Sequence, residues 1–233
     1  MKKFGIILVC LTLMGSLVSC GGDKPVQKPR TDAPVTTEDP AIQSPDDLLV
    51  PQADTLVIYF SRVGNTDFPE DVDVVSSASL NRTDGELKGN AQLMAEWMAD
   101  ETGGDLLEIQ TEYAYPADYN AATDVARQEQ NGRARPTLRS QIGSMARYST
   151  VHLVCPIWWG DLPMAVYSFF DSHDLAGKTI IVSVTHEGSG FARTVDTVRR
   201  LEPAAEVIEG LALQGGAVAV SEGVVRQFVR DIH

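Results

Sequence analysis

The sequence predicts an α/β protein in which five parallel strands lie between two layers of helices. Apolar runs typical of buried strands alternate along the chain with helical segments, and strands joined by helices pair in parallel. The first strand, Leu56–Phe60, is apolar throughout, as expected for a central strand buried on both faces. With this strand in the middle, we expect a three-layer α/β/α arrangement with the strand order 2-1-3-4-5.

The other expected elements follow in regular alternation. The remaining strands are Leu106–Ile109, Val151–Cys155, Thr179–Val184 and Val207–Leu213, the last in one or two pieces. The helices are Ala91–Ala99, Tyr119–Gln130, Ala165–Phe170, Thr194–Leu201 and Gly223–Ile232. Sheets of this kind bind ligands at the carboxyl ends of their strands, so the loops after strands one, three and four are expected to carry the chemistry.

The N-terminal residues carry export signals. Two lysines precede the apolar run Phe4–Val18, which is too short to span a membrane comfortably. The following Leu-Val-Ser-Cys20 resembles the bacterial lipobox, in which the cysteine thiol is lipidated. We expect a lipoprotein signal peptide over 1–19, a flexible tether over 20–53 and the folded domain over 54–233. An ordinary signal peptide or an uncleaved anchor, with a chance cysteine, is the alternative.

This interpretation places the domain at the cell envelope. The lipid on Cys20 would hold it to the periplasmic side of the inner membrane or to the outer membrane.

The formal net charge of −13 at pH 7 argues against a surface that binds nucleic acid.

Cysteine and histidine usage points away from metal and thiol chemistry. Cys155 lies inside an apolar strand, where a buried and inert thiol is expected. His152 is interpreted as a satisfied structural histidine, whereas His173 and His233 are expected to be exposed. The four histidines and the thiol show no metal-ligand spacing.

The loop after the first strand has the composition of an anion site. Ser61–Thr66 supplies two hydroxyl groups, an amide and a glycine directly after a buried strand. The backbone N–H groups and hydroxyls of such a loop can surround a phosphate, and Gly64 allows a close approach. The loop is neither a P-loop nor the dinucleotide motif Gly-x-Gly-x-x-Gly. A simple polar turn is the alternative.

Three segments together resemble the flavodoxin family. "YFSRVGNT" is similar to the flavodoxin phosphate loop, "PIWWGDLP" (Pro156–Pro163) to the second flavin loop and "THEGSGF" (Thr185–Phe191) to the third. They occur in the expected order, and the resemblance covers Thr55–His233. It implies FMN as cofactor, bound by residues of the three loops: Ser61, Arg62, Val63, Gly64, Asn65, Thr66, Pro156, Ile157, Trp158, Trp159, Gly160, Thr185, His186, Glu187, Gly188, Gly190 and Phe191.

The resemblance also implies individual roles. Trp159 would stack on the isoalloxazine ring; Trp158 is the second candidate and otherwise a core residue. The Gly160 carbonyl would accept the flavin N5–H, and Asp161 would cap the following helix. The backbone of Thr185–Gly190 would hydrogen-bond the pyrimidine edge.

Two further groups of side chains have alternative interpretations. His186 and Glu187 could relay protons beside a flavin, or they form a solvated loop pair. The aromatic residues of Tyr113–Tyr119 border the site or pack a strand-to-helix connection.

One segment departs from the flavodoxin pattern. Asp67–Gly89 is inserted between the phosphate loop and the first helix, and contains both apolar and acidic residues. It could move the helix N-terminus away from the phosphate, or cover the flavin.

Two classes of function therefore stay open. The first is an FMN-dependent electron carrier or small flavin oxidoreductase, which exchanges electrons with a redox partner protein or a small-molecule acceptor. The absence of a separate nicotinamide-binding motif favours the carrier. The second is a flavodoxin-fold interaction module that has lost FMN.

Overall fold

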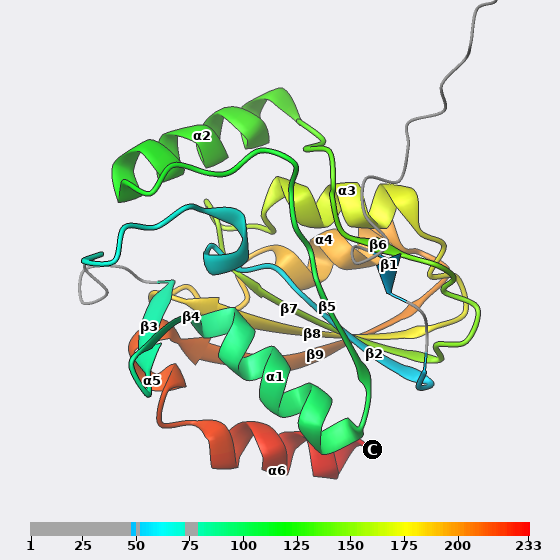
Figure 1. Ribbon diagram of the computed structural model, residues 1–233. Coiled ribbons are helices and arrows are strands. Elements are labelled where there is room, and N and C mark those ends of the chain that lie inside the picture. The colour runs from blue at the N-terminus through cyan, green and yellow to red at the C-terminus, as the bar shows by residue number, and fades with distance from the viewer. Residues whose placement is uncertain (1–47, 50–51, 73–78) are drawn as a thin grey trace, which may run out of the picture. The chain divides into compact units, whose positions relative to one another are not determined.

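The main sheet has five parallel strands in the order β5-β2-β7-β8-β9 (Figure 1). It is seen in a computed structural model that describes residues 48–49, 52–72 and 79–233; the expected signal peptide and Cys20 lie outside these residues. The strands are β2 (Thr55–Tyr59), β5 (Asp105–Glu108), β7 (Thr150–Pro156), β8 (Thr179–His186) and β9 (Glu206–Gln214). In chain order this is 2-1-3-4-5, which confirms the predicted fold class and strand order.

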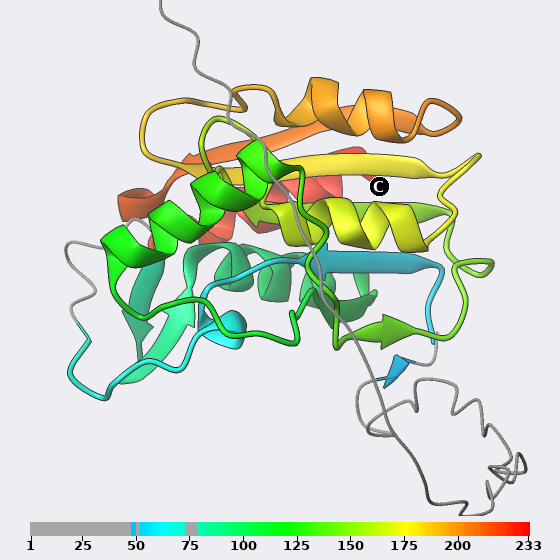
Figure 2. The same ribbon diagram turned by 90° about the horizontal axis from the view of Figure 1, so that it is seen from above.

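Helices cover both faces of the sheet (Figures 1 and 2). On one face lie α1 (Asn90–Thr102) and α6 (Glu222–Ile232), and on the other α3 (Met164–Ser172) and α4 (Thr194–Leu201). Helix α2 (Tyr119–Gly132) lies further out, and in both views it overhangs the edge at which β2 and β7 end.

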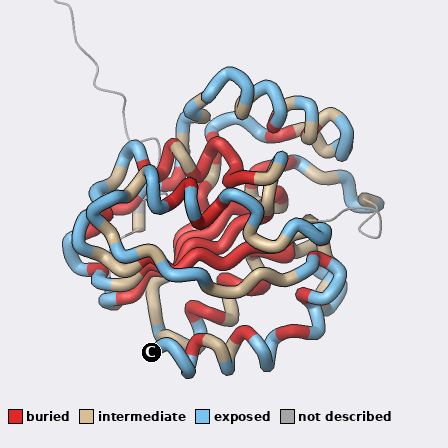
Figure 3. The backbone as a smooth tube through the Cα atoms, turned by 180° about the vertical axis from the view of Figure 1, so that it is seen from behind, coloured by how far each residue is buried: buried red, intermediate tan, exposed pale blue. Residues whose placement is uncertain are grey.

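The first strand is buried on both sides, as its apolar run predicts. Leu56, Ile58 and Phe60 pack in the core beneath α3 and α4, whereas Val57 and Tyr59 pack in the core beneath α1 and α6. Alternate side chains of a strand point to opposite faces, so both faces require apolar residues. Figure 3 shows the buried strands at the centre of the domain.

The described part of the insertion is not a plain loop. It contains an antiparallel hairpin of β3 (Leu80–Thr83) and β4 (Glu86–Gly89). The turn residues Asp84 and Gly85 have φ angles of 51° and 85°, the left-handed pair that a two-residue type I′ turn needs. The dipeptide Asp-Gly was the sequence signal for this hairpin.

The hairpin brings the chain back to the first loop. A Cβ atom added to Gly89 would lie 1.9 Å from Ser61 Oγ. Because α1 begins at Asn90, its N-terminus lies beside Ser61 although the insertion intervenes. The insertion therefore does not displace the helix from this loop.

Several short elements were not expected. The pair β1 (Leu48–Leu49) and β6 (Gln141–Ile142) forms a small parallel ladder. The helical turn η2 (Val63–Asn65) lies within the first loop, and α5 (Gly215–Val218) follows β9. Among the described residues, no helix combines the length and apolarity needed to cross a membrane.

The buried thiol and the histidines are only partly as expected. Cys155 is fully buried, and burial raises the pKa of its thiol well above the usual range. His152 is also buried, but only its Nε2 is bonded, 3.0 Å from Nε2 of the exposed His233; its Nδ1 has no partner among the described residues. His173 was expected to be exposed, yet it is half-buried and stacks on Phe169.

Candidate functional site

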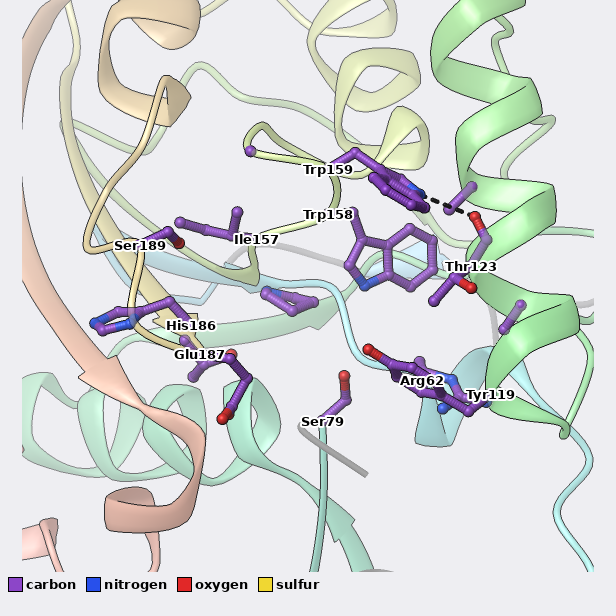
Figure 4. A pocket seen from close by; sticks show the side chains of 15 residues that line it. Arg62, Ser79, Tyr119, Thr123, Ile157, Trp158, Trp159, His186, Glu187 and Ser189 are labelled. Carbon is purple, nitrogen blue, oxygen red and sulfur yellow. Dashed lines mark hydrogen bonds between the residues drawn. The ribbon is translucent and has the colours of Figure 1, made fainter. Parts of the chain in front are cut away.

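A cavity of about 370 Å³ opens where β2, β7 and β8 end (Figure 4). This volume lies in the range of small-molecule sites, roughly 300–1,000 Å³. Nine of the predicted site residues line it: Arg62, Pro156, Ile157, Trp158, Trp159, Gly160, Thr185, His186 and Glu187. The structure thus brings the second and third predicted loops together around one space.

One wall of this cavity was missed from the sequence. Helix α2 contributes Tyr119, Ala122, Thr123 and Ala126, and Ser79 and Ser189 complete the lining. Ala122 and Ala126 are the buried residues of α2, and their spacing of four was the available signal for a small-residue face. Of the flagged tyrosines, Tyr119 lines the cavity.

Eight predicted site residues lie outside the lining. Most belong to the phosphate loop, of which only Arg62 reaches the cavity: they are Ser61, Val63, Gly64, Asn65, Thr66, Gly188, Gly190 and Phe191. The loop therefore lies beside the cavity and reaches it through Arg62.

The Asn65 side chain fixes the first loop through hydrogen bonds within the protein. Its amide nitrogen donates to the carbonyls of Ser61 and Ile109 at 2.8 and 2.9 Å, and its amide oxygen accepts two hydrogen bonds from Thr111. The backbone N–H of Tyr115 donates to the Asn65 carbonyl at 2.7 Å. With its side chain fully used, Asn65 positions the loop rather than presenting its amide to a ligand.

Arg62 is a buried cation that forms no salt bridge with a described carboxylate. Its residue exposure is 3 %, and its Nη2 donates to the carbonyls of Pro116 and Ala117, both at 3.1 Å. Nε is buried without a partner in the described structure. Burial lowers the pKa of this guanidinium, and Tyr119 and Asp118 oppose that shift in part; arginine stays charged in proteins. A buried charge that forms no direct ion pair is costly, so this position is suited to an anionic ligand.

Thr66 gives the loop a second unused donor. Its Oγ1 is buried and has no hydrogen-bond partner among the described residues. Buried polar atoms are usually bonded, and an exception calls for an explanation. The loop thus holds a charged donor, Arg62 Nε, and a hydroxyl donor, Thr66 Oγ1, that no described residue uses, and donors of these two kinds are the ones that bind phosphate.

Gly64 meets an unexpected neighbour. A Cβ atom at this position would lie 2.0–2.2 Å from the three carboxyl atoms of Glu108. A side chain at this position would therefore force the Glu108 carboxyl group to move. Burial raises the pKa of Glu108 to about 7; hydrogen bonds from Gln110, the Tyr59 hydroxyl and the Gly64 backbone N–H, and the charge of Arg139, oppose this rise only in part.

The second loop turns tightly at the mouth of the cavity. Trp158 and Asp161 exchange backbone hydrogen bonds of 2.9 and 3.0 Å. Between them Trp159 and Gly160 have φ angles of 51° and 75°, as in a type I′ turn. A left-handed conformation is strained for a residue as bulky as tryptophan.

The surroundings of Trp159 explain how that conformation is held. Its indole Nε1 donates to the carbonyl of Thr123 on α2 at 2.9 Å (Figure 4), and the Arg127 guanidinium lies 4.1 Å from the ring centroid. Trp158 instead packs edge-on against Phe60 and Tyr115, each at 5.1 Å. Both tryptophans line the cavity.

Arg193 joins the second loop to the third. Its backbone N–H donates to the Gly160 carbonyl at 3.2 Å, and its Nε lies 3.4 Å from Asp161 Oδ2. The prediction that Asp161 caps the following helix is wrong. Pro163 occupies the N-cap position of α3 and makes no side-chain cap. The Gly160 carbonyl thus already accepts one hydrogen bond, and its second lone pair is what the expected acceptor role would use.

The third loop holds His186 and Glu187 at the cavity wall. The N–H of Gly188 donates to His186 Nδ1 at 2.9 Å, which leaves the proton of a neutral imidazole on Nε2. In Figure 4 this ring points away from Arg62. Gly188 has a φ of 105°, a value that favours glycine. No described group of three or more His, Cys, Asp or Glu residues could hold a metal ion.

This architecture defines a three-layer α/β protein with a ligand site at the carboxyl edge of its sheet. The family model described as flavodoxin matches residues 82–232. The chain belongs to the flavodoxin family. A comparison with curated proteins gave no match.

Solved structures of flavoproteins share this fold. A protein described as a flavoprotein from Bacteroides uniformis is 27 % identical, with a TM-score of 0.56, over 76 % of this chain and 98 % of that one. One from Bacteroides eggerthii is 24 % identical, with a TM-score of 0.53, over 75 % and 98 %. A flavoprotein in complex with FMN from Lactobacillus acidophilus is 18 % identical, with a TM-score of 0.50, over 72 % and 98 %.

Proposed function

We propose that this protein binds FMN in the cavity and acts as an electron-transfer flavoprotein. The observation that carries the proposal is the buried guanidinium of Arg62, which belongs to the Ser61–Thr66 loop, lines the aromatic cavity and forms no salt bridge with a described carboxylate. The loop would hold the phosphate through its backbone, Arg62 and Thr66. Trp158 and Trp159 would flank the ring, and the backbone of the third loop would bind its pyrimidine edge.

Size, family and fold support this proposal. A cavity of about 370 Å³ is of the size that holds small cofactors. The chain belongs to the flavodoxin family, and the Lactobacillus acidophilus flavoprotein of the same fold is described in complex with FMN. FMN supplies the redox chemistry when bound; the protein contributes orientation and electrostatics.

The cavity is open enough for electron exchange with a partner. Tyr119 and Trp159, both at the cavity, keep 47 % and 44 % of their surface exposed. We propose a redox partner protein or a small-molecule electron acceptor at this mouth. The absence of a nicotinamide motif favours the carrier over a self-sufficient reductase.

The test is the cofactor content of the purified full-length protein. A yellow protein whose released chromophore is FMN supports the proposal. A colourless protein that binds no FMN when it is supplied in excess contradicts it, and would favour the interaction module. The acidic side chain of Glu108, packed against the proposed phosphate loop, is the observation that speaks for that second function.

We further propose an envelope location through a lipid on Cys20. The two lysines, the apolar run and the Leu-Val-Ser-Cys20 sequence support it. Metabolic labelling with a fatty acid should mark the wild-type protein and not Cys20→Ser. Equal labelling of both proteins, or none of either, would contradict the lipid anchor.

A further inference from the structure

We infer that Glu108 couples phosphate binding to a proton: the Ser61–Thr66 loop binds a doubly charged phosphate tightly only when this carboxyl group is neutral. The inference rests on the proposed function, because the phosphate concerned is that of FMN. It adds a specificity-determining residue that lies on β5, outside all three flavin loops.

The position of the carboxyl group carries the argument. It packs against Gly64, in the middle of the loop, so closely that a Cβ atom there would lie 2.0–2.2 Å from its atoms and would force it to move. Gln110 Nε2 donates to its Oε2 at 2.9 Å, and its Oε1 is buried. The carboxyl group is therefore held against the loop, and an ionised form would repel a phosphate bound there.

The groups around Glu108 leave its neutral and ionised forms close in free energy at neutral pH. Tyr59 on β2 faces it and stays neutral, because burial raises the pKa of that hydroxyl. Glu96 on α1 adds negative charge near Tyr59 but is paired with Lys88 at 2.7 Å. Burial is the largest effect, favours the neutral form and raises the pKa of Glu108 to about 7, whereas Arg139 and hydrogen bonds from Gln110, Tyr59 and the Gly64 backbone favour the ionised form. A proton is therefore exchangeable at neutral pH.

Linkage sets the direction of the effect. A phosphate monoester loses its second proton at a pKa of about 6, so above pH 7 the ligand is already a dianion. Bound phosphate raises the pKa of the neighbouring carboxyl group further, and the complex takes up a proton. The affinity for FMN should fall as the pH rises above 7, whereas riboflavin, which lacks the phosphate, should show no such fall.

The experiment titrates the full-length protein with FMN and with riboflavin, followed by flavin fluorescence, at constant ionic strength between about pH 7 and pH 8.5. For the wild type we expect the Kd for FMN to rise roughly fivefold or more across this range. Glu108→Gln should bind FMN more tightly than the wild type at pH 8.5, with little dependence on pH. The matched control Glu112→Gln, which neutralises an exposed carboxylate, should behave as the wild type does.

The outcomes separate this inference from the proposed function. If FMN does not bind at any pH, the proposed function fails. If FMN binds and Glu108→Gln keeps the wild-type dependence on pH, only the inference is overturned. If Glu108→Gln does not fold, calorimetry of the wild type in two buffers of different ionisation enthalpy measures the proton uptake directly. We expect proton uptake when FMN binds and none when riboflavin binds. No proton uptake with FMN overturns the inference.

Discussion

The amide oxygen of Asn65 accepts two hydrogen bonds from Thr111, one from its backbone N–H at 2.7 Å and one from its hydroxyl at 3.0 Å. The same side chain donates to the carbonyls of Ser61 and Ile109. One buried amide thus joins the loop after β2 to the chain that follows β5. This contact preorganises the proposed phosphate loop before any ligand arrives.

Asn65→Ala should therefore destabilise the fold. The change leaves buried carbonyl and N–H groups without partners, and we expect a loss of about 2–4 kcal/mol in the free energy of unfolding. Urea denaturation measures this loss. The control Asn120→Ala, at an exposed position of α2, should change stability by less than about 0.5 kcal/mol. A loss of stability for Asn65→Ala no larger than for the control would contradict the structural role of the Asn65 side chain.

Arg62→Met should separate binding of the phosphate from binding of the ring. Without the buried guanidinium, the Kd for FMN should rise roughly tenfold or more, whereas riboflavin should change by less than about twofold. Flavin fluorescence titration measures both constants. Arg199→Met, on the exposed side of α4, is the charge-matched control. Equal losses for FMN and riboflavin would show that Arg62 does not receive the phosphate.

Gly64→Ala and Glu108→Ala should be strongly coupled. The added methyl group meets the Glu108 carboxyl group, so Gly64→Ala alone should reduce the free energy of unfolding by about 1–3 kcal/mol. In the Glu108→Ala background, Gly64→Ala should reduce the free energy of unfolding by less than about 1 kcal/mol. A double-mutant cycle in urea measures the coupling. Gly216→Ala has nothing within 4 Å of its added Cβ and should be nearly neutral; additive effects would disprove the contact.

His152 should make the fold sensitive to acid. Burial, and then the neighbouring His233, lower its pKa from 6.5 to about 4. Between these values the unfolded chain binds a proton that the folded chain does not, so stability falls as the pH decreases from 6.5 towards 4. The full effect is on the order of 3 kcal/mol. Urea denaturation at several pH values should show a flatter profile for His152→Leu; His186→Gln should retain the wild-type slope.

Much of the fold was predictable because its signals are local. The buried strand Leu56–Phe60, the alternation with helices and the three polar loops are each encoded by neighbouring residues, and the observed strand order follows from them. The hairpin at Asp84-Gly85 was missed although its turn signal is local, because the surrounding Asp67–Gly89 was read as one insertion.

The arrangement of the site depended on long-range contacts. Glu108 reaches Gly64, and Asn65 reaches Thr111, only because β5 pairs with β2 in the sheet. The Trp159 indole bonds to Thr123 because α2 overhangs the second loop. No spacing within one segment reports such contacts, since their partners are far apart in the chain.

By itself the sequence determined the class of fold and the loops at its carboxyl edge, because apolar periodicity and turn composition are written in consecutive residues. The tertiary structure decided that Arg62 is a buried cation whose Nε has no hydrogen-bond partner among the described residues, and that a carboxyl group faces the same loop. Burial and charge pairing depend on what surrounds a residue in space, and that environment exists only once the strands and helices have packed.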